Sequence, residues 1–321
     1  MSRMLWCVLA LVCVPGGTGA SFTGSDDTPA PQQLIESLNE SANVSKLLPY
    51  QLKADLVLTP DQGIIIKGQI TYFRDRDRDR IDITAGEYHE TRIRFSDKVY
   101  VAGTRNLALP RRNFLEALER EWMILYPNSC CLAFGKVERK KTQGANSYCF
   151  VVDSPTQRPK RLCVDRDSKS LLEISARFET IHFLGYRTRD GLQYPSTVQV
   201  IDDGKMFLEI QNIEIRKGPA PPESFTAPPN SQEFENCSDL ESPHALHLEM
   251  PKVPSRWHSS YGSVYGLVQA DGSFTDIAVE VSRANPGFAQ ALKEAAAQWK
   301  FSPALCGSKA VVHEEQMELH N

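Results

Sequence analysis

The sequence lacks the features on which several large protein classes depend. No apolar run reaches the roughly 18 to 20 residues that a membrane-spanning helix needs. The net charge of −4 argues against nucleic acid or an anionic membrane as the main partner. The chain is 41% hydrophobic and 24% charged, which is typical of a globular protein, and its 321 residues are enough for two domains.

Signatures of catalysis are also missing. The sequence contains no G-x-S-x-G, no H-E-x-x-H, no P-loop and no G-x-G-x-x-G at a strand–helix turn. A zinc site built from Cys237, His244, His247 and His258 is disfavoured, because no paired CxxC motif accompanies these residues. The sequence therefore predicts a protein with no catalytic activity, no cofactor and no metal.

The first twenty residues have the pattern of a secretory signal. Arg3 supplies a positive charge, Met4 to Val14 form a short apolar core, and Pro15 ends that core before small residues up to Ala20. We expect cleavage after Ala20 and export of the rest of the chain. The alternative is an uncleaved N-terminal anchor.

Export predicts disulfide bonds. Of the eight cysteines, Cys7 and Cys13 fall within the signal, which leaves six. Cys149 and Cys163 flank a predicted hairpin, "SYCFVVDSPTQRPKRLCVD", so we expect a bridge between its strands. A second bridge between Cys237 and Cys306 is an open alternative among the 15 connectivities that six cysteines allow.

The region before residue 230 is predicted to be rich in β-strands. A helix at Pro31 to Ala42 is followed by the alternating runs "YQLKADLVLT", "GIIIKGQITYF" and "ETRIRFSDKVYVAG". The last run alternates through Ile93 and Val101. A helix is predicted at Arg111 to Tyr126, and strands resume from Tyr148 to about Ile215. This order predicts an α+β protein with one curved antiparallel sheet, not a parallel α/β fold.

Five prolines in residues 217 to 235 indicate a domain edge. We therefore divide the chain into a signal at 1–20, a β-rich domain at 21–230, a linker at 231–249 and a second domain at 250–321. The second domain is predicted to be a β-β-α-β unit. Its hairpin turns at Asp271-Gly272, its helix begins at Pro286, and "KAVVHEE" provides its third strand.

Residues about 250 to 315 resemble the TonB C-terminal domain family. The resemblance rests on the "DG" hairpin, on the W-x-F-x-P pattern at the end of the helix, and on a glycine followed by a strand. The residues that carry these features are Asp271, Gly272, Trp299, Phe301, Pro303, Gly307, Val311 and Val312.

That resemblance implies a bacterial envelope protein located in the periplasm. It also implies binding by β-augmentation, in which an edge strand pairs with a segment of another envelope protein. The implied edge consists of Ala310, Val311, Val312 and His313. A TonB-type energy transducer is the alternative, but the sequence lacks a convincing anchor and its linker is too short to cross a periplasm.

Residues about 30 to 230 resemble the fold of LolA-like periplasmic lipoprotein carriers. The resemblance rests on the order of the helix and strands and on the closing aromatic–proline segment from Phe225 to Pro229. In that family the strands form an open half-barrel around acyl chains, which implies a lipid or lipoprotein as ligand. The alternative is a curved sheet with an ordinary side-chain core.

The run "FRDRDRDRID" alternates Arg and Asp between two predicted strands. Neither set could enter a core without partners, because unpaired buried charge is very costly, so we expect a solvated hairpin tip with local ion pairs. A second reading is a rim for anionic headgroups formed by Arg74, Arg76, Arg78 and Arg80. A calcium loop is a third reading, but Arg80 stands where an EF-hand needs glycine.

Overall fold

A computed structural model describes ten segments of the chain. They are residues 28–41, 47–59, 65–103, 132–154, 157–176, 179–202, 204–237, 239–252, 261–281 and 286–320. No helix within these segments is long and apolar enough to cross a membrane. The predicted signal at 1–20, the predicted helix at Arg111 to Tyr126, and Cys130 and Cys131 lie outside them.

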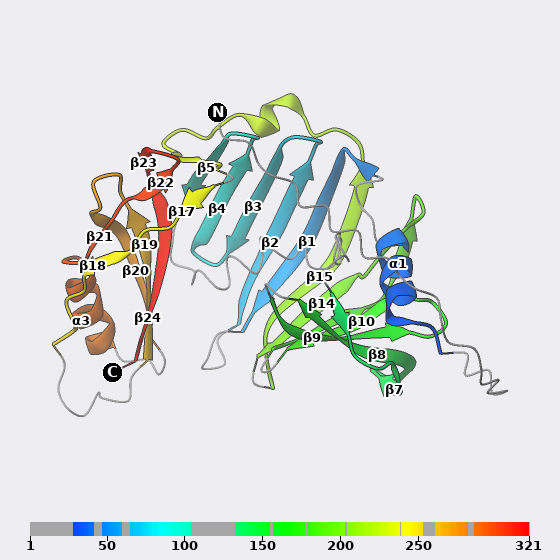
Figure 1. Ribbon diagram of the computed structural model, residues 1–321. Helices are drawn as coiled ribbons and strands as arrows, with labels where there is room; N and C mark the ends of the chain where they lie inside the picture. The colour runs from blue at the N-terminus through cyan, green and yellow to red at the C-terminus, as the bar shows by residue number, and fades with distance from the viewer. Residues whose placement is uncertain are drawn as a thin grey trace, which may run out of the picture.

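A large curved antiparallel sheet forms the body of the molecule, and a smaller module lies at one end of it (Figure 1). The order across the sheet is β16 (Gln232–Glu235), β5 (Lys98–Gly103), β4 (Tyr88–Arg94), β3 (Asp79–Ala85), β2 (Ile66–Arg74), β1 (Tyr50–Leu58), β15 (Lys205–Lys217), β14 (Thr197–Asp202), β11 (Glu179–Leu184), β10 (Leu171–Ala176), β9 (Gln157–Asp165), β8 (Ala145–Ser154) and β6 (Ala133–Phe134). β7 (Glu138–Thr142) also pairs with β8, and β12 (Arg187–Arg189) and β13 (Leu192–Tyr194) form a separate hairpin. The predicted antiparallel sheet is confirmed.

One face of this sheet, which we call the inner face, carries the apolar core. In β1 the side chains of Leu52, Ala54, Leu56 and Leu58 are all buried, as expected for strict alternation in a strand. The helix α1 (Pro31–Ser41) adds Leu34, Ile35 and Leu38 to the same core. The helix predicted at Pro31 to Ala42 is therefore confirmed, and its apolar side packs on the inner face.

A β-bulge in β15 accounts for an irregularity that is visible in the sequence. Leu208 and Ile210 are buried, and the buried positions then skip one residue to Ile213 and Ile215. The pairing with β1 shifts at the same place, because Asn212 and Ile213 together oppose Ala54. Asn212 has a φ of 53°, and its amide donates to Asp55. The extra residue bends the sheet while keeping apolar side chains on the inner face.

The strands β4 and β5 differ from the single alternating run that the sequence suggests. They form a hairpin whose turn is closed by the Phe95 amide, which donates to the carbonyl of Lys98. Val101 lies opposite Arg92 and therefore shares its face, whereas Ile93 lies opposite Tyr100 on the outer face. The interpretation that placed Ile93 and Val101 on one face is wrong, because the turn was not recognised.

The C-terminal module is a three-stranded sheet with one helix. β19 (Tyr261–Val268) lies between β20 (Phe274–Val281) and β24 (His313–His320), and α3 (Pro286–Ala296) packs on β20 and β19. The predicted turn is confirmed at Gly272, whose φ of 79° favours glycine. Trp299 is fully buried beside Phe301, and its indole N–H donates to the carbonyl of Glu249.

The segment 231–249 is not a simple linker. Its residues form β16, β17 (Leu240–Glu241) and β18 (Ala245–His247), which pair with β5, β22 (Ala304–Cys306) and β21 (Lys300–Phe301). Before it lies a 3-10 turn, η3 (Pro222–Phe225), where the predicted closing segment begins. These pairings satisfy the backbone hydrogen-bonding groups of the segment. Because β16 pairs with the large sheet while β17 and β18 pair with C-terminal strands, the segment connects the large sheet to the C-terminal part of the chain.

Two disulfide bonds lie in the described chain. Cys149 and Cys163 stand opposite each other in the β8–β9 hairpin, which is the pairing expected from the sequence. Cys237 and Cys306 form the second bridge, which ties the chain after β16 to β22. The second bridge therefore fixes the module next to the edge of the large sheet.

Replacing both Cys149 and Cys163 by alanine should lower the free energy of unfolding by about 3 kcal/mol, because the bridge closes a loop of this size in the unfolded chain. Urea unfolding of the full chain under oxidising conditions measures this loss. A change below about 1 kcal/mol would show that the hairpin is fixed by its packing alone.

Candidate binding site between the sheet and the C-terminal module

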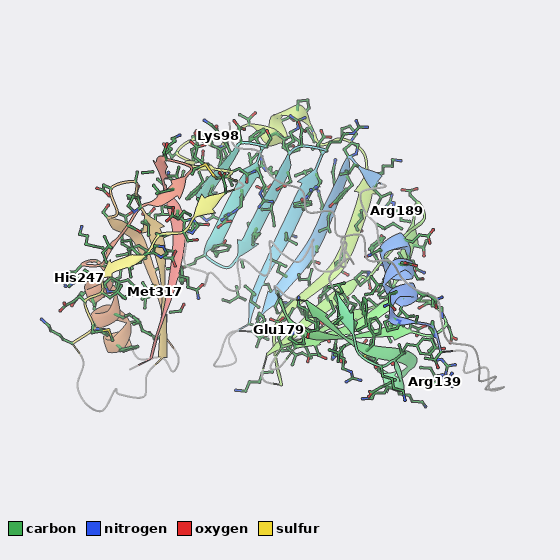
Figure 2. The ribbon with its side chains drawn as sticks, viewed as in Figure 1. Lys98, Arg139, Glu179, Arg189, His247 and Met317 are labelled. Atoms are coloured by element: carbon green, nitrogen blue, oxygen red, sulfur yellow. A yellow bond between two sulfur atoms is a disulfide. The ribbon has the colours of Figure 1, made fainter. Side chains whose placement is uncertain are left out.

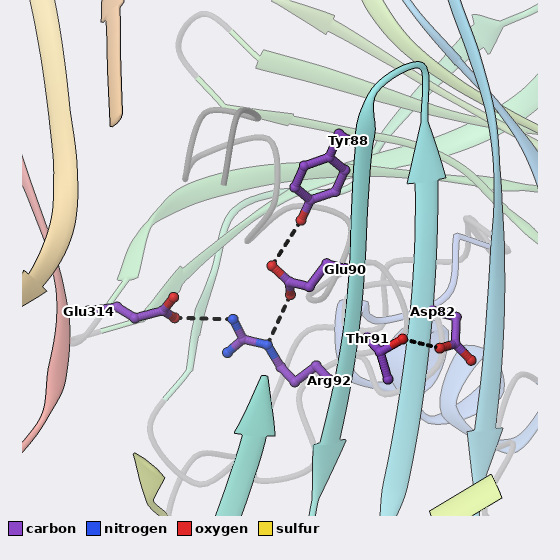
Figure 3. Close-up of polar contacts among 6 residues, drawn as sticks. All are labelled: Asp82, Tyr88, Glu90, Thr91, Arg92 and Glu314. Carbon is purple, nitrogen blue, oxygen red and sulfur yellow. Dashed lines mark hydrogen bonds and ion pairs between the residues drawn. The ribbon is translucent and has the colours of Figure 1, made fainter. Parts of the chain in front are cut away.

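A buried polar chain connects the large sheet to the C-terminal module (Figure 3). Tyr88 Oη donates to Glu90 Oε2 at 2.9 Å, and Arg92 Nε donates to Glu90 Oε1 at 3.2 Å. Arg92 Nη2 then reaches Glu314 Oε2 of β24 at 3.1 Å. The chain places β24 against the inner face at β4.

Strand alternation explains why these charged groups are buried. Tyr88, Glu90 and Arg92 stand opposite Ala85, Ile83 and Ile81 of β3, whose side chains belong to the core. Glu90 is 3% exposed and Arg92 is 9% exposed. A buried charge is tolerated only when it is paired and hydrogen-bonded, and here the Arg92 guanidinium pairs with the carboxylates of both Glu90 and Glu314. These residues were not predicted from the sequence. Their spacing of two residues from Tyr88 to Arg92 places all three on one face of a strand, which could have indicated that they act together.

A polar pocket lies beside this chain. It has a volume of about 190 Å³ and is lined by Glu90, by Val101 to Gly103, by Asn230 to Gln232 and by Asp276 of β20. The size and polar lining do not suit an acyl chain, which needs an apolar cavity. The contact between module and sheet is therefore polar at this point.

The edges of the module's sheet differ in how well they could accept another strand. β24 pairs with β19 through eight consecutive residues without a register shift, and no described strand pairs with its other side. β20, at the opposite edge, contains a register shift and a positive φ of 50° at Asp276. Bulges of this kind block edge-to-edge pairing. Of the two edges, β24 is the regular one.

The predicted partner-binding residues are divided between two strands. Ala310 and Val311 belong to β23 (Lys309–Val311), which pairs with β22, and Val312 lies between the strands. His313 is the first residue of β24. The single third strand expected at "KAVVHEE" is therefore wrong: the chain changes sheets at Val312, and the long edge begins where the predicted one ends.

The carboxylate of Glu315 and the imidazole of His313 lie near the start of β24, 3.9 Å apart. Burial raises the pKa of Glu315 above its usual value, and backbone hydrogen bonding only partly opposes this. Burial also lowers the pKa of His313, although the neighbouring Glu314 opposes that effect. The imidazole is therefore a poor positive partner for Glu315 at neutral pH.

The charged run from Arg74 to Arg80 is folded into ion pairs. The turn is closed by the Asp75 amide, which donates to the carbonyl of Arg78 at 2.9 Å. Asp79 is only 6% exposed, and its carboxylate lies 3.9 Å from Arg74 and 3.3 Å from Arg94. The expectation that the whole run is solvated is therefore wrong for Asp79, which two guanidinium groups compensate.

Three of the four arginines of the predicted headgroup rim contact groups within the chain. Arg74 pairs with Asp79, and Arg78 stacks on the Phe225 ring at 4.2 Å. Arg80 holds both oxygens of Asp82 and donates to the carbonyl of Ser224. Asp82 also accepts from Thr91, as Figure 3 shows. Arg76 is exposed and the other three are half-buried, so the structure does not bring the four together as one anion-binding cluster.

The disfavoured zinc set is not assembled in the described part of the chain. Cys237, Asp239 and Cys306 offer three ligand atoms within 4.8 Å of one another, but the two cysteines form a disulfide. His244 and His247 do not join them in that group, and His258 lies outside the described residues. Sulfur atoms in a disulfide are not thiolate ligands, so this group is not a metal site in the oxidised protein.

No known protein family and no curated protein matches the sequence. Among solved structures, a LolA superfamily protein from Nitrosomonas europaea is 12% identical, with a TM-score of 0.44 over 62% of this chain and 98% of its own. A DUF1329 family protein from Desulfovibrio piger is 10% identical, with a TM-score of 0.44 over 60% and 95%. A chain of the Pseudomonas aeruginosa MucA/MucB complex is 12% identical, with a TM-score of 0.29 over 89% and 94%. Each of these likenesses is partial, with a TM-score below 0.5, and the TonB resemblance stays a prediction.

Replacing Arg92 by methionine should lower the free energy of unfolding by about 3 kcal/mol or more, because Glu90 and Glu314 lose their shared cation in a buried site. Arg216→Met is the matched control, since Arg216 pairs with Glu214 at 2.9 Å on the surface. Urea unfolding should show a loss below about 1 kcal/mol for that control. Equal losses in the two variants would contradict the structural role given to Arg92.

Proposed function

We propose that this protein is a non-enzymatic envelope protein, exported to the periplasm, that binds another protein through its C-terminal module. The observation that carries the proposal is the outer edge of β24, which pairs with no described strand. An edge strand presents a row of backbone donors and acceptors, and extended segments of other chains bind to such rows. The two disulfides agree with an exported protein.

The proposal keeps the binding mode implied by the TonB resemblance but moves it along the chain. The implied edge from Ala310 to His313 overlaps β24 only at His313. A strand of eight residues offers far more backbone groups than the three residues of β23. Energy transduction, the alternative reading, depends on an anchor within the first 27 residues and is not needed for this function.

Lipid or lipoprotein binding in the large sheet is the second candidate. Its support is the apolar inner face, where Leu52, Leu56, Ile70, Ile81 and Ile83 line neighbouring strands. Each of these side chains is at most 5% exposed. An acyl chain would therefore have to displace groups that already cover them, which makes protein binding the better supported function.

The protein-binding function predicts that β24 takes up an extended peptide. Random peptides of about ten residues, displayed in an oxidising compartment, would be selected against the full chain. A selected peptide should slow amide hydrogen exchange in β24 by about tenfold or more, because the added strand hydrogen-bonds its outer edge. Peptides that instead protect α1 or the large sheet, or failure to select any peptide, would contradict the proposal.

Lipid binding makes a different prediction. Mass spectrometry of the native protein, purified without detergent, should find co-purifying lipid at about one molecule per chain if the inner face is a carrier site. Lipid-free protein with unchanged stability would remove the second candidate and leave the first untouched.

A further inference from the structure

We infer that the segment bound by β24 is a strand that places a lysine or arginine beside Glu315 and apolar side chains beside Met317 and Leu319. This inference rests on the proposed function and specifies the chemistry of its partner.

The pairing between β24 and β19 determines which side chains share a face. His313, Glu315, Met317 and Leu319 stand opposite Val268, Gly266, Val264 and Gly262. Val264 and Val268 belong to the buried core of the module. The four alternate residues of β24 therefore lie on the side of the sheet that carries α3, and any added strand would extend that same side.

The helix leaves the β24 end of this face incompletely covered. α3 packs on β20 and β19, and it approaches β19 so closely at Gly262 that an added Cβ would lie 2.6 Å from Leu292 Cδ2. Met317 and Leu319, one strand further out, are only partly buried although they pack against the core. Apolar side chains from a partner strand would complete their burial, which is a favourable contribution of roughly 25 cal/mol per Å².

The partly buried carboxylate of Glu315, near the start of β24, favours a partner strand with a positively charged side chain. Glu315 is partly buried, and within the described segments it pairs with His313, whose neutral form is favoured by burial, while the charge of His244 only weakly offsets the effect of burial on its pKa. A carboxylate held away from water gains most from a permanent positive charge. A lysine or arginine directly across the edge would supply one, at the short side-chain spacing of neighbouring strands.

The other face of β24 has less to offer a partner. Glu314 is already paired with Arg92, and Gln316 donates to Ser263 at 2.9 Å. The selective contacts are therefore expected on the face that carries Glu315, Met317 and Leu319. In sequence terms the partner has a cationic residue followed at intervals of two by apolar residues, or the reverse order if it runs in the opposite direction.

A second copy of the chain is a poor occupant of this edge. β24 contains no lysine or arginine, so a second copy paired antiparallel could not place a permanent positive charge beside Glu315 in any register. The strand therefore favours a positively charged partner over a second copy of itself.

Two labelled peptides of symmetric pattern test the inference without assuming a strand direction. One is TKTVTITKT and the other is TETVTITET, and their dissociation constants for the full chain are measured by fluorescence anisotropy. We expect the cationic peptide to bind about tenfold tighter or more, and to slow amide exchange in β24. In Glu315→Lys the preference should reverse toward the acidic peptide, because the charge across the edge has changed sign.

Glu241→Lys is the matched control, since Glu241 is an exposed glutamate on β17, which pairs with β22 and not with β24. It should leave the preference unchanged, whereas an equal shift in both variants would mean that net charge alone attracts the peptide and would overturn the inference. Library peptides that protect β24 but lack a cation would also overturn it while the proposed function stands. If no peptide protects β24, both fail.

Discussion

The shared pairing of Arg92 with Glu90 and Glu314 is the interaction on which the arrangement of the two halves depends. The contact is buried, so its geometry is fixed by the pairing of the Arg92 guanidinium with both carboxylates. Because Glu314 is the second residue of β24, the same contact fixes where that strand lies relative to the large sheet. Two further contacts connect the end of β16 to the β22–β23 hairpin: the disulfide between Cys237 and Cys306, and the ion pair between Glu235 and Lys309.

The strands at the edges of the large sheet and of the module differ in length and regularity. β16, at one edge of the large sheet, has only four residues, and the chain that follows it is tied to β22 by a disulfide. β20 is interrupted by a bulge at Asp276. Such short or irregular edges reduce unwanted pairing. β24 is long and regular, with charge at its start and partly buried apolar residues toward its end, so the contrast favours a specific role for this edge.

Burial and ion pairing together explain why this chain carries so many charges in strands. Asp79 sits between Arg74 and Arg94, and Arg80 holds Asp82 on the other face of the same strand. Side chains on both faces of one strand are thus compensated by their own neighbours. Figure 2 shows charged side chains such as Lys98, Arg139 and Glu179 distributed around the outside of the molecule.

The sequence by itself determined the elements whose signals are local. Alternation predicted β1 and the β8–β9 hairpin, the 3.6-residue period predicted α1 and α3, and Asp271-Gly272 predicted the turn before β20. The tertiary structure alone decided that residues 231–249 pair with distant strands, that Val312 separates two strands, and that Arg92 meets Glu314 across 222 positions of the chain. The physical reason is that hydrophobic periodicity acts within one element. Strand pairing and charge compensation depend instead on which backbone and side-chain groups the folded chain brings together.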